Sequence, residues 1–119
     1  MKLFKSPMIW FVLFFICFYG YVSGMPQEIE AKPIRVNPGA EITVNYSGAP
    51  GYDLDWIGIY PASAPPDRSW LSWQYTRKMK SGTMIFKAPD KPGKYNFRLF
   101  ENDGYKLLGT SNTVEVGDK

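Results

Sequence analysis

The stretch that decides the fold is Asp55-Trp56-Ile57-Gly58-Ile59-Tyr60, near the middle of a chain of 119 residues. From Trp56 to Tyr60 it is apolar on both faces, which is typical of a strand at the centre of a sheet. Turn-forming residues lie on either side, at 49–51 and in the proline-rich segment 61–67. The stretch therefore predicts a short buried strand between two loops.

Further strand-like runs lie on both sides of this stretch. Residues 41–47 alternate, with Ile42, Val44 and Tyr46 pointing one way, and residues 94–100 alternate in the same manner. A period of two marks a half-buried strand. The other expected strands are residues 34–36, 69–75, 83–87, 105–108 and 113–116. About seven short strands, separated by turns and without a helical period, fit an all-β, antiparallel sandwich of the immunoglobulin or fibronectin-III-like class.

Two local features sharpen this prediction. Asn102-Asp103-Gly104 is expected to form a tight hairpin turn, because Asp-Gly readily adopts the positive φ that such turns require. Tyr95 follows the turn Pro92-Gly93 at the start of a late strand, the position of the tyrosine corner in immunoglobulin-like domains. Trp56 is expected to pack as the strand-centre tryptophan of such a sandwich.

Residues 1–24 have the composition of a secretory signal peptide. A basic start with Lys2 and Lys5 precedes an apolar run, and small residues follow at 22–24. This predicts an N-terminal signal helix that is cleaved after Gly24, and a secreted or cell-envelope protein. A retained membrane anchor is the alternative, although the run is shorter than the ~20 apolar residues of a spanning helix. Residues 25–33 are expected to be a polar lead-in and residues 34–117 the sandwich.

The charge of the mature chain favours no nucleic-acid partner. Removal of Lys2 and Lys5 takes two of the 14 basic residues against 11 acidic ones, which leaves a net charge of about +1. The basic residues are spread along the chain, and the cluster at 77–80 is typical of a solvated turn. The one cysteine, Cys17, lies in the leader, so the mature fold rests on its packed core without a disulfide.

Four motifs follow one another along the chain. They are Asp55–Tyr60, the aromatic run 70–75, residues 93–100, and Asp103-Gly104-Tyr105 followed by residues 109–111. In this order they resemble the SKICH domain, an immunoglobulin-like module. The chain is also similar to the fibronectin-like N-terminal domain of plant purple acid phosphatases. The resemblance covers residues 34–116 and implies a sandwich used for targeting, association or accessory roles. It supplies no catalytic residues and no cofactor.

An enzyme is the least favoured interpretation. The chain has no histidine and its only cysteine is in the leader, which removes the commonest general base and thiol nucleophiles. Asp53 and Asp55 are two residues apart and so share a strand face, but aspartates beside a glycine are also common turn residues. Together with Glu101, Asn102 and Asp103 they are candidate calcium ligands, with turn formation as the alternative.

The aromatic residues are the candidate ligand-binding set. Trp70 and Trp73 are three apart, so on a regular strand they point to opposite faces, one into the core and one outward. With Tyr52, Tyr60 and Tyr75 they are expected to form a flat aromatic platform for a glycan or a protein.

The sequence is compatible with two functions. The first is a secreted, non-catalytic binding module with a protein or carbohydrate partner. The second is a structural component that assembles through a sheet edge, or an accessory domain that works beside a separate hydrolase. Asn45-Tyr46-Ser47 is a glycosylation sequon, with Asn45 expected to face outward. Arg98 is expected to point outward and to pair with Asp55.

Overall fold

A computed structural model of the chain describes residues 27–117. The predicted signal helix and the first two residues of the predicted lead-in, 25 and 26, lie outside the described residues. Within 27–117 every regular element is a strand, and no helix there is long and apolar enough to cross a membrane. The strands are β1 (Glu28–Lys32), β2 (Arg35–Val36), β3 (Glu41–Ser47), β4 (Trp56–Pro61), β5 (Ser72–Tyr75), β6 (Gly82–Lys87), β7 (Gly93–Phe100), β8 (Leu107–Thr110) and β9 (Val114–Val116).

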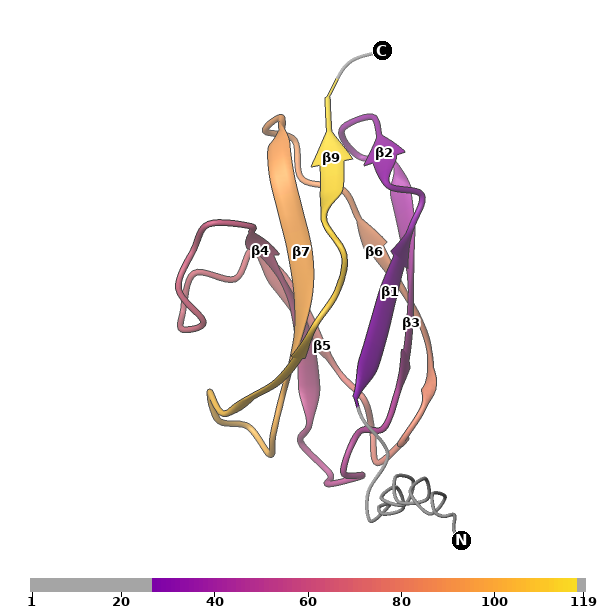
Figure 1. Cartoon of the computed structure of the whole chain (residues 1–119), viewed down its shortest axis with the longest axis vertical. Coiled ribbons are helices and arrows are strands. Elements are labelled where there is room, and N and C mark those ends of the chain that lie inside the picture. Colours follow the sequence, from indigo (N-terminus) through magenta and orange to yellow (C-terminus); the bar gives the residue numbers. More distant parts are fainter. Residues whose placement is uncertain (1–26, 118–119) are drawn as a thin grey trace, which may run out of the picture.

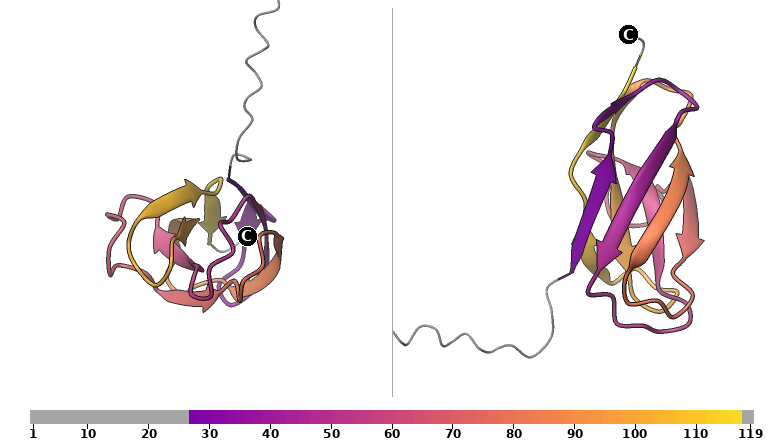
Figure 2. Two further views of the ribbon diagram at one scale, coloured as in Figure 1. Left: turned by 90° about the horizontal axis from the view of Figure 1, so that it is seen from below. Right: turned by 90° about the vertical axis from the view of Figure 1, so that its right-hand side faces the viewer.

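The strands form two sheets, as expected for a β-sandwich (Figure 1). One sheet has the order β1-β3-β6, and the other has the order β2-β9-β7-β4-β5 with β8 paired to β7. Neighbouring strands are antiparallel except β2 and β9, which are parallel. The end-on view in Figure 2 shows the strands of both sheets around a common interior. The all-β, two-sheet prediction is confirmed for the described residues.

The main core lies between the sheets and follows the predicted alternation. On β3, the buried residues are Ile42, Val44 and Tyr46, and the residues between them are partly exposed. β7 contributes Tyr95, Phe97 and Leu99 to the same core, as predicted. The contact across the two sheets includes Phe86 and Phe97, whose ring centroids are 5.0 Å apart.

The sandwich begins earlier than the sequence pattern indicated. Residues 28–32, predicted to belong to a polar lead-in, form β1 and pair antiparallel with β3. Only Ile29 and Ala31 turn inward on this strand, and Ala31 is buried. Two apolar positions among charged neighbours are too few to reveal a period of two, so this edge strand was not predicted.

Both predicted local features are present. The Tyr95 hydroxyl donates a hydrogen bond to the Lys91 carbonyl oxygen at 2.6 Å, which closes the tyrosine corner. The hairpin turn at 101–104 is closed by the Gly104 amide, which donates to the Glu101 carbonyl at 3.0 Å. The left-handed residues of the turn are Asn102 (φ 46°) and Asp103 (φ 64°), one position earlier than the Asp-Gly pair that was expected.

A second buried cluster lies on the outer face of the larger sheet. Trp56 and Tyr60 point away from the main core and pack with Phe100, while Ile57 and Ile59 of the same strand face the main core. The expectation that Trp56 is a core tryptophan between the sheets is therefore wrong. A strand that is apolar on both faces does not reveal which face meets the other sheet.

Arg98 is buried on this outer face and does not pair with Asp55. Its guanidinium lies 4.4 Å from the centre of the Tyr60 ring. Burial lowers the pKa of Arg98, and the neighbouring Tyr60 acts in the opposite direction. The guanidinium donates to the carbonyl oxygens of Pro61, Ala62 and Ala64 and to Asn96 Oδ1. Arg98 therefore anchors the proline-rich loop over the sheet.

Candidate functional site

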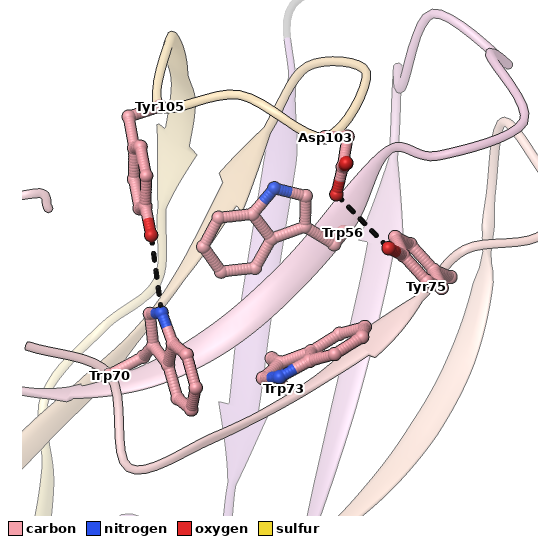
Figure 3. A pocket seen from close by; sticks show the side chains of 6 residues that line it. All are labelled: Trp56, Trp70, Trp73, Tyr75, Asp103 and Tyr105. Atoms are coloured by element: carbon pink, nitrogen blue, oxygen red, sulfur yellow. Dashed lines mark hydrogen bonds between the residues drawn. The ribbon is translucent and has the colours of Figure 1, made fainter. Parts of the chain in front are cut away.

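An aromatic pocket opens on the outer face of the larger sheet (Figure 3). It encloses about 140 Å³ and is built from β4, β5, the end of the loop that precedes β5, and the turn after β7. The residues that line this aromatic pocket are Trp56, Trp70, Trp73, Tyr75, Asp103 and Tyr105. Every tryptophan of the chain except Trp10 contributes to it.

Trp56 forms the floor of the pocket. Its side chain is only 5% exposed and stacks on Phe100, with ring centroids 4.5 Å apart and an interplanar angle of 23°. The indole Nε1 donates a hydrogen bond to the Gly104 carbonyl oxygen at 3.0 Å. This bond ties the floor to the turn that carries Asp103.

Gly58 explains how the rings approach one another. A Cβ at this position would lie 3.0 Å from the Trp56 ring, 3.2 Å from the Tyr60 ring and 3.4 Å from Trp70 Cβ. Any larger residue would push these aromatic groups apart. The Trp-x-Gly-x-Tyr spacing within residues 56–60 therefore places a glycine beneath the pocket, between two rings of one strand face.

The aromatic rings that form the walls of the pocket are steeply inclined to one another. Trp73 makes angles of 73° with Trp56 and 74° with Trp70, at centroid distances of 6.3 and 6.4 Å. Tyr105 meets Trp56 at 88° and 5.7 Å, and Tyr75 meets Trp73 at 73° and 4.6 Å. The aromatic groups thus form a box, which corrects the expectation of a flat platform.

The polar rim of the pocket contains one carboxylate. The Tyr75 hydroxyl donates to Asp103 Oδ1 at 3.0 Å, and this hydrogen bond raises the pKa of Tyr75. On the opposite side, Trp70 Nε1 donates to the Tyr105 hydroxyl at 3.4 Å (Figure 3). Asp103 is exposed, so its charge faces the mouth of the pocket.

Asp55 holds the rim from below. It is fully buried, and Oδ2 accepts hydrogen bonds from the amides of Gly51 and Tyr52, each at 3.0 Å. Oδ1 accepts from the Asn102 amide at 2.9 Å, 47 residues further along the chain. This one carboxylate therefore joins the loop before β4 to the turn that carries Asp103.

The candidate calcium ligands do not come together. Asp55 is occupied by the three amides, Asp53 Oδ1 lies 3.3 Å from Lys78 Nζ, and Asp103 accepts from Tyr75. Within residues 27–117 no group of three or more acidic, histidine or cysteine side chains is placed to hold a metal ion. Asp55 joins the two loops through their backbone amides, but each carboxylate is used separately.

The structure brings three of the five predicted aromatic residues together: Trp70, Trp73 and Tyr75. Tyr60 is fully buried beneath the loop, and Tyr52 is 49% exposed but lies outside the pocket. The expectation that Trp70 and Trp73 face opposite sides is wrong, because Trp70 precedes β5 and does not follow its alternation. Both residues line the same pocket, with Trp73 40% exposed and Trp70 half-buried.

Sequence reasoning missed Trp56 and Tyr105 as pocket residues and Asp103 as a rim carboxylate. The signal for Trp56 was its spacing from Gly58, since residues two apart share a strand face and a glycine there leaves room above it. No signal in the sequence placed Tyr105 opposite Trp70, because this contact joins segments 35 residues apart.

Tyr60 gives the outer cluster a testable pH dependence. Its hydroxyl donates to the Asp67 carbonyl at 2.6 Å, and burial raises the pKa of Tyr60 to about 12. A raised tyrosine pKa stabilises the fold fully below pH ~10, the unfolded value, and this contribution is lost as the pH rises to about 12. The loss is expected to be about 2–3 kcal/mol, because each pKa unit corresponds to ~1.4 kcal/mol.

The check is the free energy of unfolding in urea at several pH values between neutral and 12. Tyr60→Phe should lower the free energy of unfolding by about 1 kcal/mol at neutral pH, because the hydrogen bond is lost. Above pH ~10 its free energy of unfolding should decline less steeply than that of the parent chain. Tyr52→Phe, a change at an exposed tyrosine, is the control. An unchanged alkaline slope in Tyr60→Phe would show that Tyr60 is not the group responsible.

No known protein family matches this chain, and no curated protein sequence matches it. Among solved structures, it is similar to the Pseudomonas fluorescens alkylpurine DNA glycosylase AlkC bound to DNA containing an abasic site analogue. The TM-score is 0.50 at 12% identity, over 87% of this chain and 33% of that one. The chain thus spans a third of the glycosylase chain, and the likeness concerns the fold alone.

Two further structures give lower scores. The sulfur carrier protein SoxY from Chlorobium limicola has a TM-score of 0.42 at 17% identity, over 79% of this chain and 81% of that one. A CARDB domain from Pyrococcus furiosus, in complex with di-metal ions, has a TM-score of 0.41 at 18% identity, over 78% and 94% of the two chains. The resemblance to SKICH domains and to purple acid phosphatases is not confirmed and stays a prediction.

Proposed function

We propose that this chain is a non-catalytic binding module, secreted or held at the cell envelope, that captures its ligand in the aromatic pocket. The observation that carries the proposal is the convergence of three tryptophans and two tyrosines from four separate segments on one opening of about 140 Å³. Large aromatic side chains exposed together are costly for a monomer, and such surfaces mark sites of interaction.

The chemistry of the lining favours binding over turnover. The ionisable groups of the pocket are Asp103, Tyr75 and Tyr105. Asp103 is exposed and already accepts a hydrogen bond from Tyr75, whereas a general base is usually tuned by burial or by a paired group. A single rim carboxylate above stacked rings suits the orientation of a bound ligand.

The rigidity of the pocket supports the same conclusion. Trp56 is held by Phe100 beneath it and by its bond to Gly104, and Trp70 Nε1 lies 3.4 Å from the Tyr105 hydroxyl. Aromatic walls that are already ordered lose little conformational entropy when a ligand enters. The signal-peptide pattern of residues 1–24 supports a location outside the cytoplasm.

The test is a ligand screen with a matched pair of variants. The full chain carrying Trp10→Phe has tryptophans only in the pocket, so its fluorescence reports the pocket directly. The screen covers soluble oligosaccharides, neutral apolar alcohols and organic cations, and hits are measured by titration calorimetry. Trp73→Ala is expected to weaken binding about 10–100-fold, as is typical of a central aromatic contact.

Tyr52→Ala is the matched control, because Tyr52 is as exposed as Trp73 but lies outside the pocket. It should bind within about twofold of the parent chain, since peripheral side chains contribute little. Circular dichroism verifies that both variants are folded. If no probe binds saturably, or if both variants lose binding equally, the aromatic pocket is not the binding site.

A further inference from the structure

The size of the aromatic pocket limits what it can enclose. A protein cavity of roughly 150 Å³ accommodates benzene, so an opening of about 140 Å³ holds a group of five or six heavy atoms. A hexose ring with its hydroxyl groups is about twice that size and would rest across the mouth. The occupant that fills the box is therefore a small compact group.

The orientation of the rings favours a rounded group over a flat one. Trp73 stands at 73° to Trp56 and 74° to Trp70, so three ring faces or edges border the same space from different directions. Tyr105 adds a further wall at 88° to Trp56. A planar ligand can stack on only one of these surfaces, whereas a tetrahedral group contacts several at once.

The charges around the pocket favour a cation. Asp103 is the carboxylate at the rim, and it has no lysine or arginine nitrogen within 4.0 Å among the residues that the structure describes. The nearby acids are already paired: Asp53 with Lys78 at 3.3 Å, and Glu101 with Lys106 at 3.5 Å. The negative charge at the mouth thus adds to the electron-rich faces of the rings, which themselves attract cations.

The hydrogen-bonding groups favour a cation without N–H donors. A primary ammonium group needs several acceptors to replace its hydration shell. Here the Tyr105 hydroxyl already accepts from Trp70 Nε1 and Asp103 Oδ1 already accepts from the Tyr75 hydroxyl, so the main acceptor left in the lining is Asp103 Oδ2. One carboxylate oxygen does not replace the acceptors that the three N–H donors of a primary ammonium need. A methylated ammonium is weakly hydrated and needs only the ring faces and one nearby negative charge.

We propose that the aromatic pocket binds a quaternary trimethylammonium group, as carried by choline. This inference rests on the proposed binding function and names its ligand class. The trimethylammonium group with its adjoining methylene has five heavy atoms, which matches the volume. Trp56 lies beneath it, Trp70, Trp73 and Tyr105 surround it, and Asp103 supplies the counter-charge at the mouth.

The decisive comparison is between choline and its neutral carbon isostere, in which a tert-butyl group replaces trimethylammonium. The two have the same shape and differ in charge. Calorimetric titration of the full chain with Trp10→Phe is expected to show choline binding at least tenfold more tightly, because only the cation gains from the ring faces and Asp103. Trp73→Ala should weaken choline binding about 10–100-fold, as expected for a central aromatic contact.

Asp103→Asn and Asp53→Asn form a matched pair of charge variants. Both remove one exposed carboxylate, but only Asp103 lines the pocket. Asp103→Asn is expected to weaken choline binding about three- to tenfold, and Asp53→Asn less than twofold. Vesicles of phosphatidylcholine, compared with vesicles of phosphatidylglycerol, distinguish a lipid-borne head group from a free ligand.

The outcomes separate this inference from the proposed function. Equal binding of choline and the isostere, or saturable binding of an oligosaccharide alone, would overturn the trimethylammonium inference and leave a binding pocket. Equal effects of the two charge variants would overturn the role of Asp103. If neither choline, nor phosphatidylcholine vesicles, nor any other probe binds, both proposals fail.

Discussion

Replacing Asp55 with alanine is expected to lower the free energy of unfolding by about 3–5 kcal/mol. The carboxylate is fully buried and accepts from the amides of Gly51, Tyr52 and Asn102 at 2.9–3.0 Å. Its removal leaves three partly buried N–H groups without their acceptor. Each such group costs about 1–3 kcal/mol, and some of this cost is recovered where water enters.

The same change should disturb the pocket, because the Asn102 amide holds the turn that carries Asp103. We therefore expect the tryptophan fluorescence of Asp55→Ala to shift even where the protein is still folded. Asp55→Asn is expected to lower the free energy of unfolding by about 2–3 kcal/mol. The asparagine side chain keeps one acceptor oxygen but presents its NH₂ group to the backbone amide that the other carboxylate oxygen had accepted from.

Urea unfolding at neutral pH measures both losses, with Asp53→Ala as the control. Asp53 lies two residues away and pairs with Lys78 at the surface, with both side chains more than two-thirds exposed. Its replacement should change the free energy of unfolding by less than about 1 kcal/mol. A loss below about 1 kcal/mol in Asp55→Ala would show that the three amide contacts do not hold the two loops together.

Replacing Arg98 with methionine is expected to lower the free energy of unfolding by about 2–4 kcal/mol. Methionine retains much of the length of the buried side chain but donates no hydrogen bonds. The carbonyl oxygens of Pro61, Ala62 and Ala64, along with Asn96, then lose their shared donor. The ring of Tyr60 also loses the guanidinium 4.4 Å from its centre.

This prediction separates a structural role from a general effect of charge. Arg35→Met is the matched control, because Arg35 is 72% exposed and lies 3.7 Å from Glu115 at the surface. It should change the stability by less than about 1 kcal/mol. Limited proteolysis should cut Arg98→Met first within residues 61–71, the loop that Arg98 holds. Equal losses in the two variants, or cleavage elsewhere, would contradict the anchoring role.

The local sequence pattern was sufficient to predict which residues of β3 and β7 form the main core. The alternation in β3 and β7 correctly predicted which residues face inward, because successive side chains on a strand point to opposite sides whatever the strand packs against. The tyrosine corner at Tyr95 and the turn at 101–104 were also predictable, since both are formed by residues close together in sequence.

Local pattern could not distinguish the two apolar faces of β4. Ile57 and Ile59 face the opposite sheet, whereas Trp56 and Tyr60 lie on the outer face. There Trp56 forms the floor of the pocket, and Tyr60 lies beneath the loop that Arg98 holds in place. Both faces are buried, so the sequence shows no difference in polarity between them. The same loop buries Tyr60, which was predicted to be exposed, and it delivers Trp70 to the pocket.

The sequence by itself determined that residues 27–117 are all-β and which residues of β3 and β7 face the main core, and it showed an excess of aromatic residues. The tertiary structure alone decided that these residues form a box beside Asp103. The physical reason is the range of the contacts: the Asp55–Asn102 and Trp56–Gly104 bonds that position the rim join residues 47 and 48 apart. The periodicity of a strand shows which of its side chains share a face, but only the folded chain determines what each face packs against.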